Sequence, residues 1–110
     1  MNIEINNFIN ACVAKGMAEQ SGNSEADKLH FDTITSVYHF LKSNNKLNDL
    51  VELFEHENPY VRLWAAYYSL QTTPSKAEST LEKLSKEKGF MAGFSAQITL
   101  NEWRKGNLKF

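Results

Sequence analysis

The side chains in this 110-residue chain that could bind a metal or move protons are three histidines, His30, His39 and His56, and a single cysteine, Cys12. A zinc site needs histidine or cysteine ligands at close spacing, and the sequence has neither an H-x-x-x-H nor a C-x-x-C pattern. Nucleophilic catalysis needs a base beside a serine or cysteine, and no G-x-S-x-G turn or glycine-rich phosphate loop occurs. The sequence therefore predicts a protein that is not an enzyme and holds no metal or cofactor, and it gives the histidines no catalytic role.

Cys12 lies beside Phe8, Ile9 and Val13, so we expect it to be a small core residue. A single cysteine forms no intramolecular disulfide and suits a reducing compartment. The first residues carry no basic signal-like segment, and no apolar run reaches membrane-spanning length. These features predict a cytoplasmic protein.

Charged side chains are nearly balanced in number but unevenly placed. The net charge of -1 argues against binding nucleic acid or a membrane through bulk charge. Asp49, Glu52 and Glu55 lie in a stretch without lysine or arginine, and helical spacing directs them away from the apolar residues of the same segment. This acidic face would suit a basic protein partner, although an ordinary solvated helix face has the same composition.

Arg62 is the one arginine within an apolar segment. The stretch Pro59-Tyr60-Val61-Arg62-Leu63-Trp64-Ala65-Ala66 resembles the second helix of a HEAT-type helical pair. That resemblance implies a structural role for Arg62, paired with Glu57 or Asp32, and contact with a partner is the alternative.

Helices have to position these side chains, because every long segment fits a period of 3.6 residues better than a period of 2. Short polar, glycine and proline runs separate the segments. The predicted helices cover residues 3–19, 24–42, 47–54, 59–70, a segment from 74 toward Gly89, and a segment through 94–103 that stops at Gly106. The sequence thus predicts one all-α domain, residues 1–110, with about six helices and no strand.

Three of these helices have a recognisable start. Asn58 is a good N-cap, and Pro59 follows at the first helical position, where proline is best tolerated. Thr73 and Pro74 repeat that arrangement. Ser24 with Asp27 is the expected cap of the helix over 24–42.

The sequence also resembles itself at an offset of 30 residues. Val51 aligns with Leu81, Trp64 with Phe94, and other apolar positions follow in the same register. Similarity at such a period is typical of stacked helix pairs, so we expect three stacked antiparallel hairpins in an α-solenoid fragment. A compact helical bundle with helices of equal length is the alternative.

Three blocks resemble a bacterial family of small helical proteins related to HEAT repeats. The blocks are Pro59-Tyr60-Val61-Arg62-Leu63-Trp64-Ala65-Ala66, then Ala77-x-x-x-Leu81-x-x-Leu84, and Gly93-Phe94-x-Ala96-x-x-x-Leu100-x-Glu102-Trp103-Arg104-x-Gly106. The resemblance implies a HEAT-like protein-binding fold. Small proteins of this kind are similar to immunity proteins of contact-dependent and polymorphic toxin systems in bacteria, which hold a cognate toxin inactive.

A protein-binding fold needs a contact surface, and the 59–70 helix offers one. Tyr60, Leu63 and Tyr67 fall outside its inward stripe at Val61, Trp64, Ala65 and Tyr68, so we expect them to be exposed interface anchors. If the second helices of the pairs share a surface, Asp32, Thr35, His39, Gln97 and Asn101 flank them. The alternative is that the tyrosines pack under the C-terminal tail, against Leu108 and Phe110.

The leading hypothesis is a monomeric immunity protein that neutralises a toxin, most readily a basic nuclease, by direct binding. The alternative is a HEAT-like scaffold or adaptor without a toxin partner, which self-associates through the tyrosine surface.

Overall fold

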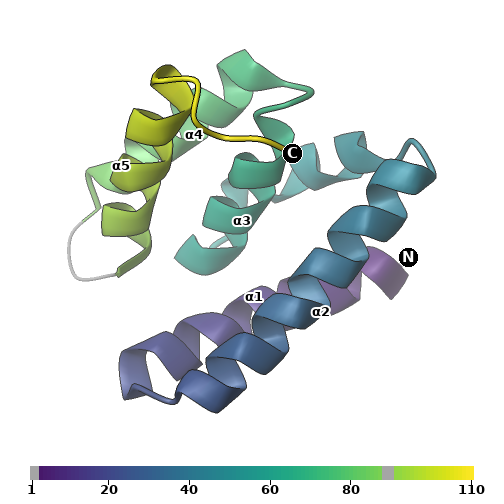
Figure 1. The fold of residues 1–110 in the computed structure, drawn as a ribbon, viewed down its shortest axis with the longest axis vertical. Coiled ribbons are helices and arrows are strands. Elements are labelled where there is room, and N and C mark those ends of the chain that lie inside the picture. The colour runs from purple at the N-terminus through teal and green to yellow at the C-terminus, as the bar shows by residue number, and fades with distance from the viewer. Residues whose placement is uncertain (1–2, 88–90) are drawn as a thin grey trace.

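A computed structural model describes residues 3–87 and 91–110, and these residues form six helices without a strand (Figure 1). The helices are α1 (Ile3–Ser21), α2 (Ser24–Ser43), η1 (Leu47–Glu55), α3 (Pro59–Ser69), α4 (Pro74–Ser85) and α5 (Met91–Arg104). The prediction of an all-α fold with about six helices is confirmed. Gly89, the predicted end of the fifth helix, lies outside the described residues.

The third helix differs in type from the prediction, because η1 is a 3-10 helix rather than an α-helix. Its buried residues are Leu47, Leu50 and Leu53, which recur every three residues. A helix with three residues per turn places all three on one side, whereas an α-helix would spread them apart. Burial of this leucine row therefore favours the tighter winding.

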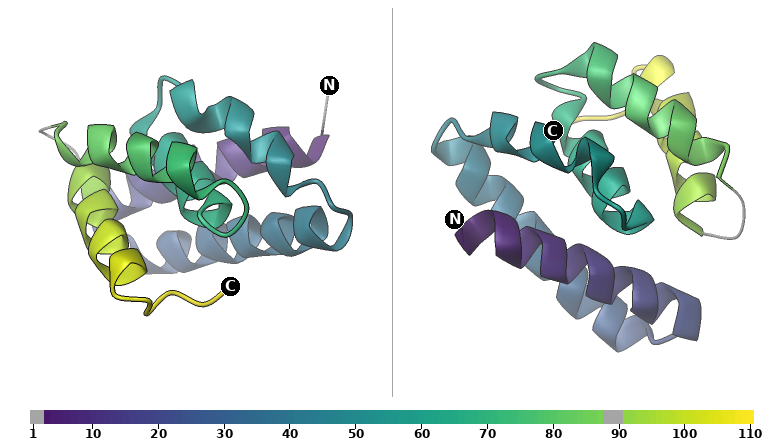
Figure 2. Two further views of the ribbon diagram at one scale, coloured as in Figure 1. Left: turned by 90° about the horizontal axis from the view of Figure 1, so that it is seen from above. Right: turned by 180° about the vertical axis from the view of Figure 1, so that it is seen from behind.

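Consecutive helices pack as three antiparallel pairs, α1 with α2, η1 with α3, and α4 with α5. In the second pair, the hydroxyl of Thr73 after α3 lies 3.5 Å from Oδ1 of Asn48 at the start of η1. Figure 1 shows α2, α3 and α5 toward the viewer, and the right panel of Figure 2 shows α1, η1 and α4 in front when the molecule is seen from behind. The second helix of each pair therefore lies in one layer.

The central helix is α3, which packs against α1, η1, α4 and α5. Val61, Ala65 and Tyr68 join a hydrophobic cluster with α1, α2 and η1, while Ala66 and Leu70 join another with α4 and α5. Ala65 and Ala66 are fully buried, and their small side chains let neighbouring helices approach closely. Both hydrophobic clusters therefore depend on α3.

The closest approach is between α1 and α3, at Gly16. A Cβ atom on Gly16 would lie 2.2 Å from Cδ2 of Tyr60, far inside van der Waals contact. The ring of Tyr60 therefore occupies the space that a side chain at position 16 would need.

The starts of the helices confirm one prediction in full and correct two. Asn58 caps α3, accepting hydrogen bonds from the amides of Tyr60 at 2.9 Å and Val61 at 3.3 Å. The cap of α2 is Asn23 rather than Ser24, because Gly22 makes the turn at φ +72° and leaves the Asn23 oxygen 3.1 Å from the amide of Ala26.

At α4, Pro74 begins the helix as predicted, but the hydroxyl of Thr73 does not cap it. That hydroxyl is directed toward Asn48 instead.

Candidate binding groove

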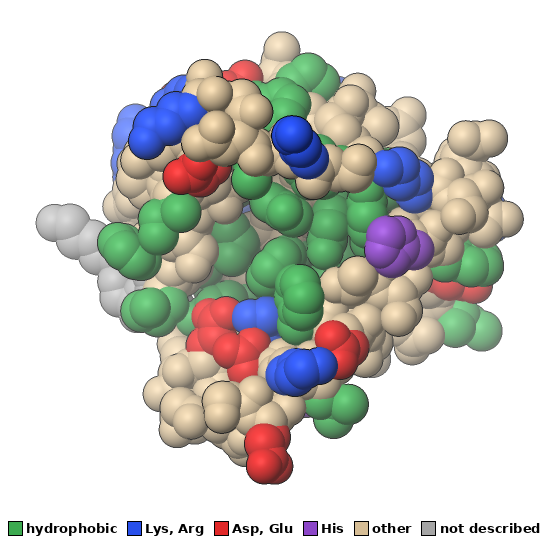
Figure 3. Space-filling model, viewed as in Figure 1, with side chains coloured by type: hydrophobic (Ala, Val, Ile, Leu, Met, Phe, Trp, Pro, Cys, Tyr) green, Lys and Arg blue, Asp and Glu red, His purple; other side chains and the backbone are tan. Residues whose placement is uncertain are grey.

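A groove runs between α2 and α5 with α3 as its floor. Figure 3 shows hydrophobic side chains gathered in this hollow, with charged groups around it. One part, which we call the aromatic pocket, has a volume of about 360 Å³. Its lining residues are Lys15, Glu19, Phe31, Leu63, Trp64, Tyr67, Tyr68, Ser95 and Thr99.

A second hollow of about 390 Å³ adjoins the first, and we call it the acidic pocket. It lies between the α1–α2 turn and the start of α5, and its lining residues are Ala18, Glu19, Gly22, Asn23, Ser24, Asp27, Met91 and Ser95. Glu19 and Ser95 line both pockets. The two hollows are therefore neighbours, and we refer to them together as the groove.

Ring-to-ring packing fixes the floor of the aromatic pocket. The Trp64 ring lies 5.8 Å from that of Phe31 and 5.6 Å from that of Tyr67, and Tyr68 stacks on Tyr38 at 4.1 Å between centroids. Burial raises the pKa of Tyr68 to about 12. The floor is thus a set of α3 rings that pack on one another and on the rings of Phe31 and Tyr38 from α2.

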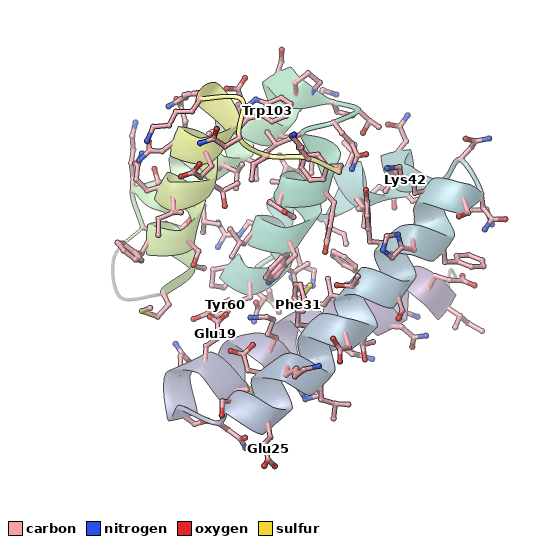
Figure 4. All side chains as sticks on the ribbon, in the orientation of Figure 1. Glu19, Glu25, Phe31, Lys42, Tyr60 and Trp103 are labelled. Carbon is pink, nitrogen blue, oxygen red and sulfur yellow. The ribbon has the colours of Figure 1, made fainter. Side chains whose placement is uncertain are left out.

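A buried lysine in the lining of the aromatic pocket pairs with two carboxylates that line the acidic pocket. The Nζ atom of Lys15 lies 2.6 Å from Oε1 of Glu19, 2.6 Å from Oδ1 of Asp27 and 5.3 Å from the centre of a Trp64 ring. Burial by itself would lower the pKa of Lys15, but hydrogen bonds to Asp27 and Glu19 and the charges of both carboxylates outweigh it and raise that pKa. Figure 4 labels Glu19, Phe31 and Tyr60 in the region where α3 faces the α1–α2 hairpin.

Large apolar side chains are exposed on the two helices that border the groove. They include Phe31 on α2 and Met91, Phe94 and Ile98 on α5, with exposed fractions of 40% to 64%. The three on α5 recur at i, i+3 and i+7, so they form one stripe, while Ala92, Ala96 and Leu100 face the core. Phe94 aligns with Trp64 at the offset of 30 residues, but it is exposed because the small alanines take the buried side of α5.

Four predicted contact residues lie on α2 and α5, the two helices that border the groove. Asp32 and His39 are exposed on α2, where Asp32 pairs with Lys28 at 3.2 Å. Gln97 and Asn101 are exposed on α5 and joined by a 3.1 Å hydrogen bond. All four residues lie on helices of the shared layer, and their role in binding remains a prediction.

The three predicted anchors on α3 are placed differently from the expectation. Tyr60 is 4% exposed and Leu63 is 5% exposed, so the prediction that they stand free is wrong. The reason is that α3 is central and has neighbours on nearly every side. Tyr67 is half-buried with its ring 5.2 Å from that of Phe110, which matches the alternative of packing under the tail.

The predicted acidic face lies elsewhere, on η1. Glu52 and Glu55 are exposed as expected, whereas Asp49 is half-buried. Glu52 and Glu55 line a hollow of about 730 Å³ between η1 and α4, with Lys76 and Lys83 also in its lining. The acidic face therefore shares its hollow with basic side chains, which the sequence could not reveal because they come from α4.

Arg62 also lines this hollow, and its predicted partners, Glu57 and Asp32, are wrong. Its guanidinium pairs with both oxygens of Glu87, at 2.5 Å and 3.1 Å. The hydrogen bonds from Arg62 lower the pKa of Glu87. Glu87 follows α4 in the chain and lies beside Arg62 only because α4 packs antiparallel to its neighbours.

Two further properties concern only the part of the chain that is described. Within residues 3–87 and 91–110, no group of three His, Cys, Asp or Glu side chains is arranged to hold a metal ion. No helix in these ranges has the length and apolar character needed to cross a bilayer.

Comparison with known proteins places the chain in a family. Residues 4–103 match the domain of unknown function DUF2019, and the chain belongs to this family. Its fold is similar to that in the crystal structure of the protein RPA1889 from Rhodopseudomonas palustris CGA009, with a TM-score of 0.90 and 26% sequence identity over 97% of this chain and 90% of that one. No functionally curated protein matches the sequence.

Proposed function

We propose that this protein is a protein-binding module, and specifically an immunity protein that neutralises a cognate toxin domain by direct binding. The observation that carries the proposal is the groove between α2 and α5, where Phe31 lines the aromatic pocket and Met91 lines the acidic pocket, with Phe94 and Ile98 exposed on the same helix as Met91. Contiguous exposed apolar surface with a polar rim is typical of protein interaction sites.

Two features support a toxin as the partner. The first is the resemblance of three sequence blocks to HEAT-related helical proteins, together with the layer of second helices that offers one continuous face. The second is the exposed pair Glu52 and Glu55 on η1, which would attract a basic nuclease at long range. In this view, the groove supplies most of the affinity and η1 supplies part of the association rate.

The test is co-expression with the toxin domain encoded by the neighbouring gene. We expect the wild-type protein to restore growth and to form a stable complex on gel filtration. A Phe94→Ser variant should lose most of the rescue, whereas a matched substitution outside the groove, Leu29→Ser on exposed α2 surface, should keep it. Failure of the wild-type protein to protect or bind would refute the proposal.

The exposed stripe on α5 also favours a second function, a self-associating scaffold. In that case Met91, Phe94 and Ile98 would bury one another across a dimer. Light scattering distinguishes the two functions. The scaffold is supported if the molecular mass of the wild type doubles as concentration rises and the mass of Phe94→Ser stays that of one chain.

A further inference from the structure

We propose that the groove recognises a partner segment that presents an apolar side chain next to a lysine or arginine. The apolar side chain enters the aromatic pocket and the cation enters the acidic pocket. This inference rests on the proposed function as a protein-binding module and names the chemistry of the segment that is bound.

The charges at the acidic pocket favour a cation. Glu19 and Asp27 carry two negative charges and Lys15 carries one positive charge, and within the described ranges no other cation pairs with either carboxylate. Lys15 contacts only one oxygen of each, Oε1 of Glu19 and Oδ1 of Asp27. The second oxygens remain available as acceptors, and both side chains keep access to solvent at 25% and 32% exposure.

Lys15 itself does not fill the acidic pocket. Its side chain is 9% exposed and lines the aromatic pocket, while Glu19 lines both pockets and Asp27 lines the acidic one. A buried ammonium held by two carboxylates fixes their positions in advance, so an incoming guanidinium meets acceptors that are already oriented.

The two pockets are close enough to bind neighbouring side chains of one segment. They share Glu19 and Ser95 in their linings, so they lie next to each other. The aromatic pocket, at about 360 Å³, accepts one large apolar side chain against Phe31 and Trp64. Met91 extends the apolar rim beside the acidic pocket and would cover the stem of a lysine or arginine.

The experiment uses small probes that join the two chemistries. The full chain, labelled with ¹⁵N, is titrated with phenylbutylguanidinium and, separately, with phenylbutyrate, which has the same apolar part and the opposite charge. We expect millimolar binding of the cation, with shifts at the Trp64 indole N–H and the Ser95 amide, and binding of the anion at least roughly fivefold weaker. Equal affinities for the two probes, or no shifts at the groove, would overturn the proposal.

Three variants assign the binding to the groove. Glu19→Gln should weaken binding of phenylbutylguanidinium roughly fivefold, and binding of phenylbutyrate should not become weaker. Because Glu19→Gln also removes one partner of buried Lys15, Ser95→Leu provides a second variant that fills both pockets from a half-buried surface position and should abolish binding of both probes. Glu52→Gln, on η1 and outside the groove, should change neither. Unchanged cation binding in Ser95→Leu would also overturn the inference.

The probe titration and the growth rescue test separate hypotheses. Selective cation binding without rescue would refute the toxin partner and support the proposed chemistry of the groove. Rescue without cation selectivity would support the immunity function and refute this mode of recognition.

Discussion

Gly16 and Tyr60 illustrate how single residues set the geometry of this molecule. Because Gly16 has no side chain, the Tyr60 ring packs directly on the α1 backbone and α3 sits close to the α1–α2 hairpin. This contact brings the first turn of α3, which contains Tyr60, toward Glu19 and the groove. The sequence pattern predicted Tyr60 on the outer face of its helix and could not show that α1 covers that face.

We predict that Gly16→Ala destabilises the protein by about 1 to 3 kcal/mol, because the added methyl group collides with the Tyr60 ring. Urea unfolding measures the change. Asn10→Ala, at an exposed position of the same helix, is the control and should be neutral or slightly stabilising. A double variant with Tyr60→Ala should recover part of the loss, and strictly additive costs would contradict the collision.

Tyr68 gives a prediction at alkaline pH. Burial raises its pKa to about 12 in the folded protein, whereas an unfolded tyrosine ionises near pH 10. The folded state therefore holds its proton longer, and stability falls as pH rises from about 10 to about 12, by roughly 2 to 3 kcal/mol.

The measurement compares the free energy of unfolding of the wild type and Tyr68→Phe across this pH range. Cys12, Lys15, Tyr60 and Tyr67 also have raised pKa values and titrate in both proteins, so the difference between the two proteins reports the ionisation of Tyr68 together with its coupling to Cys12 and Tyr67. Parallel profiles of the two proteins would show that Tyr68 does not cause the loss.

At the scale of elements, the helices were predictable where local signals decide them. Asn58 and Pro59 define the start of α3 through their own side chains, and the structure agrees. The 3-10 winding of η1 was missed, although the row of Leu47, Leu50 and Leu53 at a spacing of three carried the signal. Pairings between elements, such as Arg62 with Glu87, lie beyond local reasoning because they join residues 25 positions apart.

The Arg62–Glu87 pair ties α3 to the segment after α4, and we predict that its contribution depends on pH. Since the folded pKa of Glu87 is lowered, the pair stabilises the protein above the ordinary glutamate pKa, and this stability is lost as pH falls through the folded value. Glu87→Gln should therefore cost stability at neutral pH and little in acid.

Urea unfolding at pH values on either side of that range tests the prediction. Glu55→Gln is the matched control, because this exposed side chain forms no ion pair within the described residues. An equal cost of Glu87→Gln at both pH values would argue against the pair. Arg62→Lys should keep the charge but lose the two-point contact, and it should be intermediate.

At the scale of the whole molecule, the two hydrophobic clusters share α3, so we predict a single cooperative unfolding transition. Leu100→Ala, in the cluster of α4 and α5, should cost about 2 to 5 kcal/mol. Hydrogen exchange should show protection lost equally in α5 and in α2, although α2 lies in the other cluster. Faster exchange in α5 alone would indicate two independent folding units.

The all-α class and the three antiparallel pairs followed from periodicity and turn signals in the sequence. The candidate groove did not, because it is built by packing. Lys15 belongs to a helix whose apolar stripe gives no hint of a buried cation, and its partners come from the next turn and the next helix. Phe94 shows the same limit, since it aligns with the partly buried Trp64 at the offset of 30 residues and is nevertheless exposed.

The separation of α5 into a buried side and an exposed side has an evolutionary consequence. Ala92, Ala96 and Leu100 hold the helix in place, while Met91, Phe94 and Ile98 touch little of the interior. Selection can therefore exchange the outward residues one at a time without a folding penalty. If the protein binds a toxin as proposed, its surface on α5 can change in step with the toxin while the buried side of the helix stays the same.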